Sequence, residues 1–389
     1  MRKIRSILLA ASLALCGCQN IQETQEYTEA DFTAAIVADL HYTSAPSAFN
    51  GIVPLEPLCL EVTDALIAQI IDEKPDALIM LGDNTNNGRE EDVLQLAPKL
   101  KKIKDAGIEL IMIPGNHDYG QSSMKPYETD FVPLLKMDEK DTASFSYALH
   151  THGVSVLAMD SSHYGDTGGR FDEKTMEFLE QQLIKAEERN EHVLFLSHHN
   201  VIAGIEESAY KGYLIQNDSL YDLLKKHHVR ICLSGHQHAQ SVYHHEDMYE
   251  ILTGMPFGSS CSYGWLKMNE TGVSYSLKQI DLETYGEETA YAKAQALIQK
   301  QSDSFLTAFV NFCREAELDE ETSQGVLDLI SFFFESYGRG TLEADAETIM
   351  NDPYYEEMME LLKDKNYGPW MERLLHHPPL NGSECSFEW

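Results

Sequence analysis

The chain has 389 residues, of which 43% are hydrophobic, and this is enough for one large packed domain with a smaller addition and excludes large-scale disorder. The formal net charge of −34 excludes binding of a long polyanion through the general field of the protein, so we expect no nucleic-acid polymer as a partner. A small phosphorylated substrate is compatible with this charge if metal ions supply positive charge locally.

The first residues are predicted to be a targeting signal rather than part of the fold. Three basic residues precede an apolar run at 7–15, which is too short to span a membrane as a stable helix. The run ends in Leu-Cys-Gly-Cys at 15–18, which resembles a bacterial lipoprotein signal. We therefore expect residues 1–17 to be a signal peptide, a lipid on Cys18 to anchor the protein to a membrane outside the cytoplasm, and residues 18–30 to be a tether. The alternative is an ordinary signal peptide or an N-terminal anchor.

Residues 31–285 are predicted to form one α/β domain, because short β-rich runs alternate with amphipathic helical stretches. The continuously apolar run at 77–81 is typical of a strand buried on both faces. In chain order the predicted elements are strand 34–38, helix 60–71, strand 77–81, helix 90–106, strands 109–113, 144–149 and 154–159, helix 173–188, strand 193–196, helix 220–226, strand 230–233 and hairpin 265–278.

The pattern of apolar and polar residues changes near residues 282–288, where it ceases to predict strands and begins to predict helices. Residues 286–389 are therefore predicted to be a helical C-terminal subdomain, with helices at 290–317, 321–337, 353–362 and 370–375. The sequence leaves open whether this subdomain is a lid, a dimer surface or a brace on the sheet, and it does not indicate an oligomeric state. We favour packing against the α/β domain with a contribution to the rim of the substrate site.

The five cysteines outside the signal region have no CxxC spacing and are odd in number. This pattern argues against a disulfide framework and against a zinc-thiolate site, although one isolated bridge stays open. These residues are Cys59, Cys232, Cys261, Cys313 and Cys385.

Polar clusters stand at or just after the ends of five predicted strands, the edge at which α/β folds gather ligands. They are Asp39-Leu40-His41, Gly82-Asp83-Asn84, Gly115-Asn116-His117-Asp118, Ser197-His198-His199 and Gly235-His236-Gln237-His238. Asp39 and His41 are two residues apart, which places both side chains on one side of an extended backbone. A mixed Asp, His and Asn set suits Mn, Fe or Zn, whereas it has too many histidines for calcium and lacks the cysteines of structural zinc.

Together these clusters resemble the calcineurin-like metallophosphoesterase family, whose pattern is DxH…GD…GNH(D/E)…H…GHxH. The resemblance implies a four-layer α/β sandwich, in which two mixed β-sheets are flanked by helices and two divalent or trivalent metal ions lie at one edge. The implied ligands are Asp39, His41 and His238 for the first metal, Asn116, His198 and His236 for the second, and Asp83 as the bridge between both.

The resemblance also implies a mechanism, in which a two-metal centre activates a hydroxide that attacks phosphorus. His117 is the expected catalytic residue outside the ligand set, where it stabilises the phosphate or protonates the leaving oxygen. Either His198 or His199 could be the ligand from its cluster. Family members with two adjacent histidines use the first, which favours His198.

One departure from the family's protein-phosphatase branch bears on the substrate. That branch reads GDxxDRG at the second motif, and here Asn86 and Asn87 replace the Asp and the Arg. The Asn-rich form is similar to bacterial cyclic-nucleotide and glycerophosphodiester phosphodiesterases of the family, so we expect hydrolysis of small phosphodiesters. The alternatives are a phosphomonoesterase acting on nucleotides or sugar phosphates and, less favoured because the ligands and His117 are retained, a non-catalytic binding scaffold.

Overall fold

The fold is seen in a computed structural model of the 389-residue chain. The structure describes residues 28, 30–44, 48–49, 53–54, 56–120, 123–202, 214–217, 219–257, 261–286, 292, 306–365 and 367–389. The predicted signal peptide and the lipidated Cys18 lie outside these residues, as does most of the predicted tether. Within the described part of the chain, no helix is long and apolar enough to cross a membrane.

The first sheet combines a parallel part from the beginning of the domain with an antiparallel part from its end. Its strand order is β15-β14-β13-β1-β4-β5. The pairs β1–β4 and β4–β5 are parallel, and β13 pairs with β1 antiparallel. The strands are β1 (Asp31–Val37), β4 (Ala77–Leu81), β5 (Glu109–Ile113), β13 (Ser262–Asn269), β14 (Gly272–Gln279) and β15 (Glu384–Glu388).

The second sheet has the order β11-β12-β10-β9-β8-β7-β6 and a parallel centre formed by β8, β9, β10 and β12. Its strands are β6 (Glu139–Lys140), β7 (Tyr147–Thr151), β8 (Val154–Met159), β9 (His192–Ser197), β10 (Ile231–Ser234), β11 (Ser241–His245) and β12 (Met248–Leu252). Outside both sheets, β2 (Ala48–Phe49) and β3 (Val53–Pro54) form a separate two-stranded ribbon.

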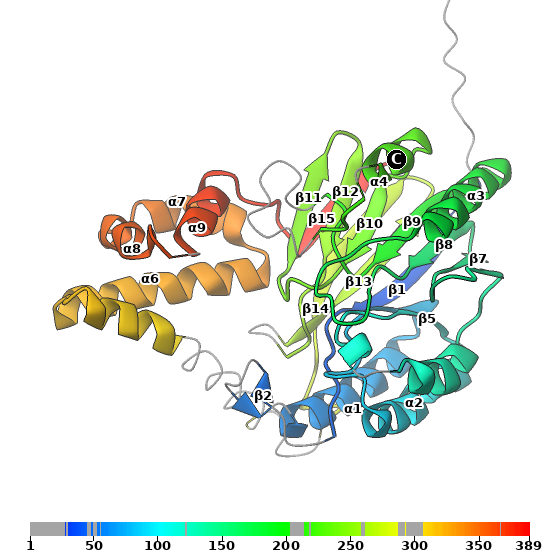
Figure 1. The fold of residues 1–389 in the computed structure, drawn as a ribbon, viewed down its shortest axis with the longest axis horizontal. Coiled ribbons are helices and arrows are strands. Elements are labelled where there is room, and N and C mark those ends of the chain that lie inside the picture. Colours follow the sequence, from blue (N-terminus) through cyan, green and yellow to red (C-terminus); the bar gives the residue numbers. More distant parts are fainter. Residues whose placement is uncertain are drawn as a thin grey trace, which may run out of the picture.

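The two sheets pack face to face and helices cover their outer faces, so the domain has four layers (Figure 1). Residues of both inner faces, such as Ile36 and Val156, share one buried cluster. The helices α1 (Glu56–Glu73) and α2 (Glu90–Asp105) cover the first sheet, and α3 (Glu173–Arg189) and α4 (Leu220–Lys226) cover the second. The predicted fold class is confirmed.

The C-terminal region forms helices around an apolar core of its own, beside the sandwich (Figure 1). Its helices are residues 306–315, α6 (Glu320–Arg339), α7 (Leu342–Met350), α8 (Tyr355–Leu362) and α9 (Tyr367–His376). The region does not stay helical to its end, because Glu384–Glu388 return as β15 and pair antiparallel with β14. Residues 287–291 lie outside the described chain, so the predicted boundary at 285/286 stays a prediction.

Most predicted elements of the α/β domain are present. The predicted hairpin turns at residues 269–272, and the strands predicted at 144–149 and 154–159 pair with each other as β7 and β8. The short strands β2, β3 and β6, the strands β11, β12 and β15 and the helix α7 were not predicted. In β11 and β12, His and Glu interrupt the apolar pattern. Among the described residues all five cysteines are free thiols.

Candidate metal centre

The seven predicted ligands lie together at the edge where strands of both sheets end. Loops after β1, β4 and β5 come from the first sheet, and loops after β9 and β10 come from the second. Because these strands are parallel within each sheet, their carboxyl ends meet at one edge, and packing of the sheets brings the two edges together. The fold thus collects side chains that are up to 199 positions apart between Asp39 and His238.

The first group consists of Asp39, His41, Asp83 and His238, whose candidate ligand atoms all lie within 4.8 Å of one another. His41 Nε2 is 3.0 Å from His238 Nε2 and 3.7 Å from Asp83 Oδ2. His238 Nε2 is 3.5 Å from Asp39 Oδ1. These atoms converge on a space that a single cation of moderate hardness would suit.

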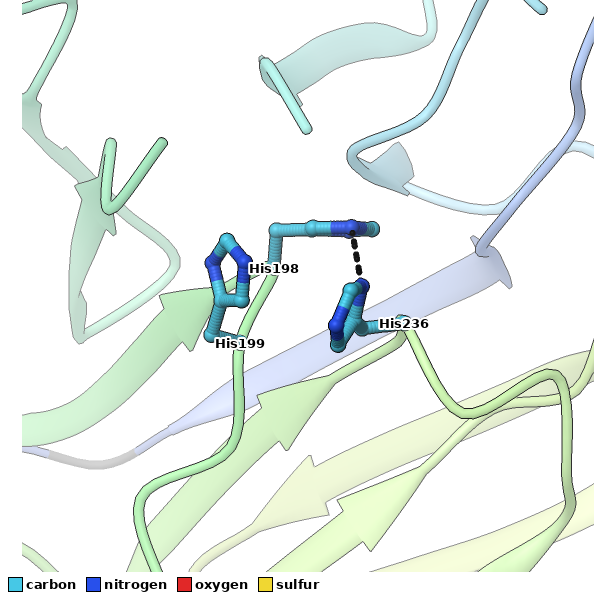
Figure 2. Close-up of side chains that lie close together, drawn as sticks. All are labelled: His198, His199 and His236. Carbon is cyan, nitrogen blue, oxygen red and sulfur yellow. Dashed lines mark hydrogen bonds between the residues drawn. The ribbon is translucent and has the colours of Figure 1, made fainter. Parts of the chain in front are cut away.

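The second group forms around His198. Its Nδ1–H donates to the Leu81 carbonyl at 2.9 Å, which turns Nε2 inward. That Nε2 atom lies 3.1 Å from Asn116 Oδ1 and 3.2 Å from His236 Nδ1 (Figure 2). It is also 3.4 Å from Asp83 Oδ2. Asp83 therefore faces both groups through the same oxygen, the arrangement expected of a bridging carboxylate.

The two adjacent histidines can be told apart by their hydrogen bonds. His199 Nε2–H donates to the Thr167 carbonyl at 3.1 Å, and His199 Nδ1 accepts from the Ser161 hydroxyl at 2.8 Å. Burial holds the pKa of His199 well below its usual value, so the ring is neutral. Both nitrogens are occupied by the protein, although the ring lies beside His198 and His236 in Figure 2. The geometry favours His198 as the ligand.

Burial gives the site unusual protonation equilibria. Desolvation lowers the pKa of His238 to about 4 and holds that of His41 well below its usual value, so both rings are neutral and can offer lone pairs. Burial and the neighbouring Asp83 raise the pKa of Asp39 to about 8. Burial acts against ionisation of Asp83 too, but His198 outweighs it and holds the Asp83 pKa well below its usual value. The concentration of buried acids and imidazoles is chemically suited to cations.

The loops that carry these side chains adopt backbone conformations that non-glycine residues rarely take. Five of the seven predicted ligands have positive φ angles, namely Asp39, His41, Asp83, His236 and His238. Glycines before the motifs make the close approach possible: a Cβ at Gly82 would lie 2.6 Å from the His198 ring, and one at Gly115 would lie 2.2 Å from Asp83. Strain of this kind is typical of binding sites and requires support from the surrounding structure.

Asp118 supplies part of that support, a role that sequence reasoning did not assign. Its carboxylate is buried and accepts hydrogen bonds from the backbone amides of Asn84, Thr85 and Gly115 at 2.9–3.1 Å. It also accepts from the side chains of Asn84 and Thr85. Asp118 thereby ties the loop after β4 to the loop after β5. The position of an acid directly after Gly-Asn-His was the available signal.

The ring of the predicted catalytic residue His117 is oriented by a backbone carbonyl rather than by a carboxylate. Its Nδ1–H donates to the Asn86 carbonyl at 2.7 Å, and its amide donates to Asp83 Oδ1 at 2.7 Å. The ring lies edge-on to His41, with centroids 4.5 Å apart. The replacement of Asp by Asn86 therefore leaves His117 held in place. Asn87 is exposed at the same loop.

The donor set fits a pair of metal ions. The first group offers two neutral imidazoles and a carboxyl group, and the second offers two imidazoles and an amide oxygen. His41 and His198, one from each group, lie 3.7 and 3.4 Å from Asp83 Oδ2. This chemistry matches moderately hard transition-metal ions.

Comparison with known proteins places this site in a family. The sequence profile of the calcineurin-like phosphoesterase family matches residues 32–240, more than half of the chain. Over 170 residues the chain is 30% identical to a protein of Arcobacter nitrofigilis described as a probable glycerophosphodiester phosphodiesterase, covering 43% of this chain and 58% of that protein. It is 23% identical over 214 residues to a probable cyclic nucleotide phosphodiesterase of Rhodococcus erythropolis, covering 55% of this chain and 67% of that protein.

A further glycerophosphodiester phosphodiesterase, from Enterobacter lignolyticus, matches over 51% of its own length, so the chain spans little more than half of these two relatives. Among solved structures, a dimetal phosphatase of Danio rerio superposes with a TM-score of 0.52 at 14% identity, over 64% of this chain and 97% of that chain. At this identity the likeness supports the fold alone.

Proposed function

This chain belongs to the calcineurin-like phosphoesterase family, a family of dimetal hydrolases acting on phosphoester bonds, and we propose that it hydrolyses small phosphodiesters. The observation that carries the proposal is the convergence of two groups of ligand atoms on Asp83, beside a histidine that neither group uses. In this proposal Asp39, His41 and His238 bind one metal, and the remaining assigned ligands (Asn116, His198 and His236) bind the other.

The chain's own residues have distinct parts in the reaction. Two bound metal ions would supply a Lewis-acidic centre that lowers the pKa of water and neutralises charge on the phosphate. Asp83 holds the two ligand groups at a fixed separation and, through its Oδ1, fixes the amide of His117. The Nδ1–H of His117 donates to the Asn86 carbonyl, so Nε2 is the nitrogen available to the substrate or the leaving oxygen.

Two features support a diester rather than a monoester. Asn86 and Asn87 carry no charge where the phosphoprotein-phosphatase branch has an Asp and an Arg, and a diester has one negative charge fewer than a monoester. The relatives described as cyclic-nucleotide and glycerophosphodiester phosphodiesterases point to the same class. Diesters of glycerol or cyclic nucleotides are therefore the proposed substrates.

An activity panel on the full chain in detergent tests this proposal. With added Mn, bis-p-nitrophenyl phosphate should be hydrolysed faster than p-nitrophenyl phosphate, and cyclic nucleotides or glycerophosphodiesters should follow the diester. A strong preference for p-nitrophenyl phosphate, or for nucleotide and sugar monophosphates, would replace the diesterase proposal by the phosphomonoesterase. Metal binding without hydrolysis of either class would favour a scaffold.

We also propose that the protein is anchored outside the cytoplasm by a lipid on Cys18, as the Leu-Cys-Gly-Cys run at 15–18 indicates. Replacement Cys18→Ala should move the activity from the membrane fraction to the soluble fraction, or stop processing of the precursor. Mass spectrometry of the N-terminal peptide provides the control. An unmodified Cys18 in native membranes would contradict the anchor.

A further inference from the structure

The loop that carries His236 and His238 is in contact with the C-terminal helices as well as with the sheets. The Tyr337 hydroxyl, near the end of α6, donates to Gln237 Oε1 at 2.9 Å. Gln237 lies between the two histidines in the sequence. Ala239 directly follows His238 and is buried within the apolar core of the helical region. The helical region therefore meets the candidate metal centre at Gln237 and Ala239, the residues that lie between and directly after two of its predicted ligands.

The end of α6 fits closely against the same segment. Gly340 ends the helix with φ of 77°, and a Cβ at this position would lie 3.0 Å from both Cγ and the carbonyl oxygen of Gln240. The Gln240 side chain in turn accepts from the Gly254 amide at 3.2 Å and from the Tyr275 hydroxyl at 3.3 Å. Residues 237–240 are thus enclosed between α6 and the sandwich.

Gln237 also forms a hydrogen bond to the other metal-binding loop, the loop after β9. Its Nε2–H donates to Asn200 Oδ1, and Asn200 Nδ2–H donates to Ser234 Oγ at 2.9 Å and to the Gly235 carbonyl at 3.3 Å. Asn200 lies two residues after His198. One amide side chain therefore connects α6, the loop after β9 and the loop after β10.

A buried carboxylate completes the connection. Glu250 on β12 accepts from the Ser234 hydroxyl at 2.7 Å and from the amides of Val201 and Ile202 at 2.8 Å each. These hydrogen bonds offset the cost of burying the Glu250 side chain and fix the start of the loop after β9. The Tyr337 hydroxyl reaches this network from outside the sandwich.

The loop after β10 needs such a restraint because of its conformation. His236 and His238 have φ angles of 69° and 53°, in the left-handed region, which is unfavourable for a non-glycine residue. Relaxation of either residue would separate His236 Nδ1 from His198 Nε2, now 3.2 Å apart, or His238 Nε2 from His41 Nε2, now 3.0 Å apart.

We propose that Tyr337 is a positioning residue for the metal centre, and that the C-terminal helices hold the His236–His238 loop in its metal-binding conformation through Gln237. The helical region is then part of the support of the centre rather than a separate appendage. This inference rests on the ligand set proposed above, but it does not depend on the substrate.

Metal affinity of the full chain tests the inference without any substrate. Tyr337→Phe removes the hydroxyl and keeps the aromatic ring, which stacks on Phe333 and lies edge-on to Trp370. Tyr355→Phe is the matched control, since this tyrosine lies in the same region on α8 and the described residues make no hydrogen bond to its hydroxyl. Competition of Mn²⁺ between each variant and a chelating dye gives the affinity, and melting of the metal-free protein reports stability.

Tyr337→Phe should weaken Mn²⁺ binding by about three- to tenfold, less than the roughly 10–100-fold cost of losing a direct hydrogen-bond partner of a ligand, because Tyr337 acts through Gln237. Tyr355→Phe should bind as the parent does. If Tyr337→Phe does not fold, Gln237→Met decides, because it removes both hydrogen bonds of the connection and should weaken binding further. Unchanged affinity in the variant that folds, or an equal loss in Tyr355→Phe, would overturn the inference. A lower melting temperature with unchanged affinity would also overturn it, since it would show a structural role alone.

Discussion

The candidate metal centre and the core of the C-terminal helices are stabilised in opposite ways. At the metal centre, carboxylates and imidazoles are buried beside one another, and the backbone has positive φ angles at five predicted ligands. In the helical region, Phe309, Phe333 and Trp370 lie in an aromatic core where ring packing and apolar burial dominate. The metal centre is thus costly to form without cations, whereas the helical core is favourable by itself.

This difference suggests that the two regions have different roles, with the metal centre binding cations and the helical core stabilising the fold. A site that must bind cations cannot be optimised for the stability of the metal-free protein. The cations require closely spaced carboxylates and imidazoles and strained loops, and these features destabilise the protein when no cation is bound. Apolar packing elsewhere must then hold the loops in place. Apart from Tyr337, through which the helices contact the metal-binding loop, substitutions in the two regions should consequently separate activity from stability.

The largest effect is expected from Asp83→Asn, which removes the charge facing both ligand groups. Hydrolysis should fall by about 10⁴-fold, equivalent to roughly 5.5 kcal/mol, because the shared ligand of the two metals is weakened. The metal-free protein should melt within a few degrees of the parent, since His198, whose pKa the acid raises to about 9, can give up its proton. Retained activity would contradict the role of Asp83 as the shared ligand, and with it the contrast between the two regions.

Phe309→Ala should show the converse behaviour in the helical core. Phe309 is fully buried and packs against Phe312 and Tyr367, so its truncation should lower the free energy of unfolding by about 3–5 kcal/mol, measured by denaturant titration. Well below the melting temperature, kcat should stay within about twofold of the parent, because the substitution leaves the ligands in place. Loss of kcat in a variant shown to be folded would mean that the two regions are not separable.

His117→Asn sharpens the comparison within the metal centre itself. Because His117 belongs to neither ligand group, the variant should lose about 10²–10³-fold in kcat while binding two metals with parental affinity. Metal counting on the purified variant is the necessary control. A simultaneous loss of metal would show that His117 acts as a ligand rather than as an acid or phosphate contact.

The smallest effect is expected from Asn87→Arg, at an exposed position of the loop after β4. A positive charge here should favour the dianionic monoester, and we expect the ratio of monoesterase to diesterase kcat/KM to rise by about tenfold or less. Asn87→Gln keeps the side chain neutral and controls for its length. An equal change in both variants would remove charge as the basis of the diester preference.

The sequence predicted those parts of the molecule that depend on local pattern. The apolar run at 77–81 and the polar clusters after five strands were sufficient for the central strands and for the seven candidate ligands, which the fold brings together. Parallel strands place such clusters at one edge whatever lies between them, so the prediction did not require the details of the helices.

Features that depend on distant partners could not be predicted in this way. Asp118 braces two loops through hydrogen bonds to residues 33 and 34 positions away, and Tyr337 reaches Gln237 across 100 positions. The strand β15 exists because its Cys385 and Phe387 pack on the sandwich while Glu384 and Glu388 face outward, and a lone acidic segment after four helices gives no such indication. His199 is distinguished from His198 by its tertiary hydrogen bonds, which the sequence does not show.

Titration of chelator-treated protein with Mn²⁺ tests the central claim most directly. Metal content and bis-p-nitrophenyl phosphate hydrolysis are followed together, in the parent and in Asp83→Asn. If the centre is dinuclear, the parent should bind two ions per chain and reach full activity only as the second ion binds, whereas Asp83→Asn should remain inactive throughout. Full activity of the parent in the presence of excess chelator, or saturation of activity at one ion per chain, would contradict a two-metal phosphoesterase.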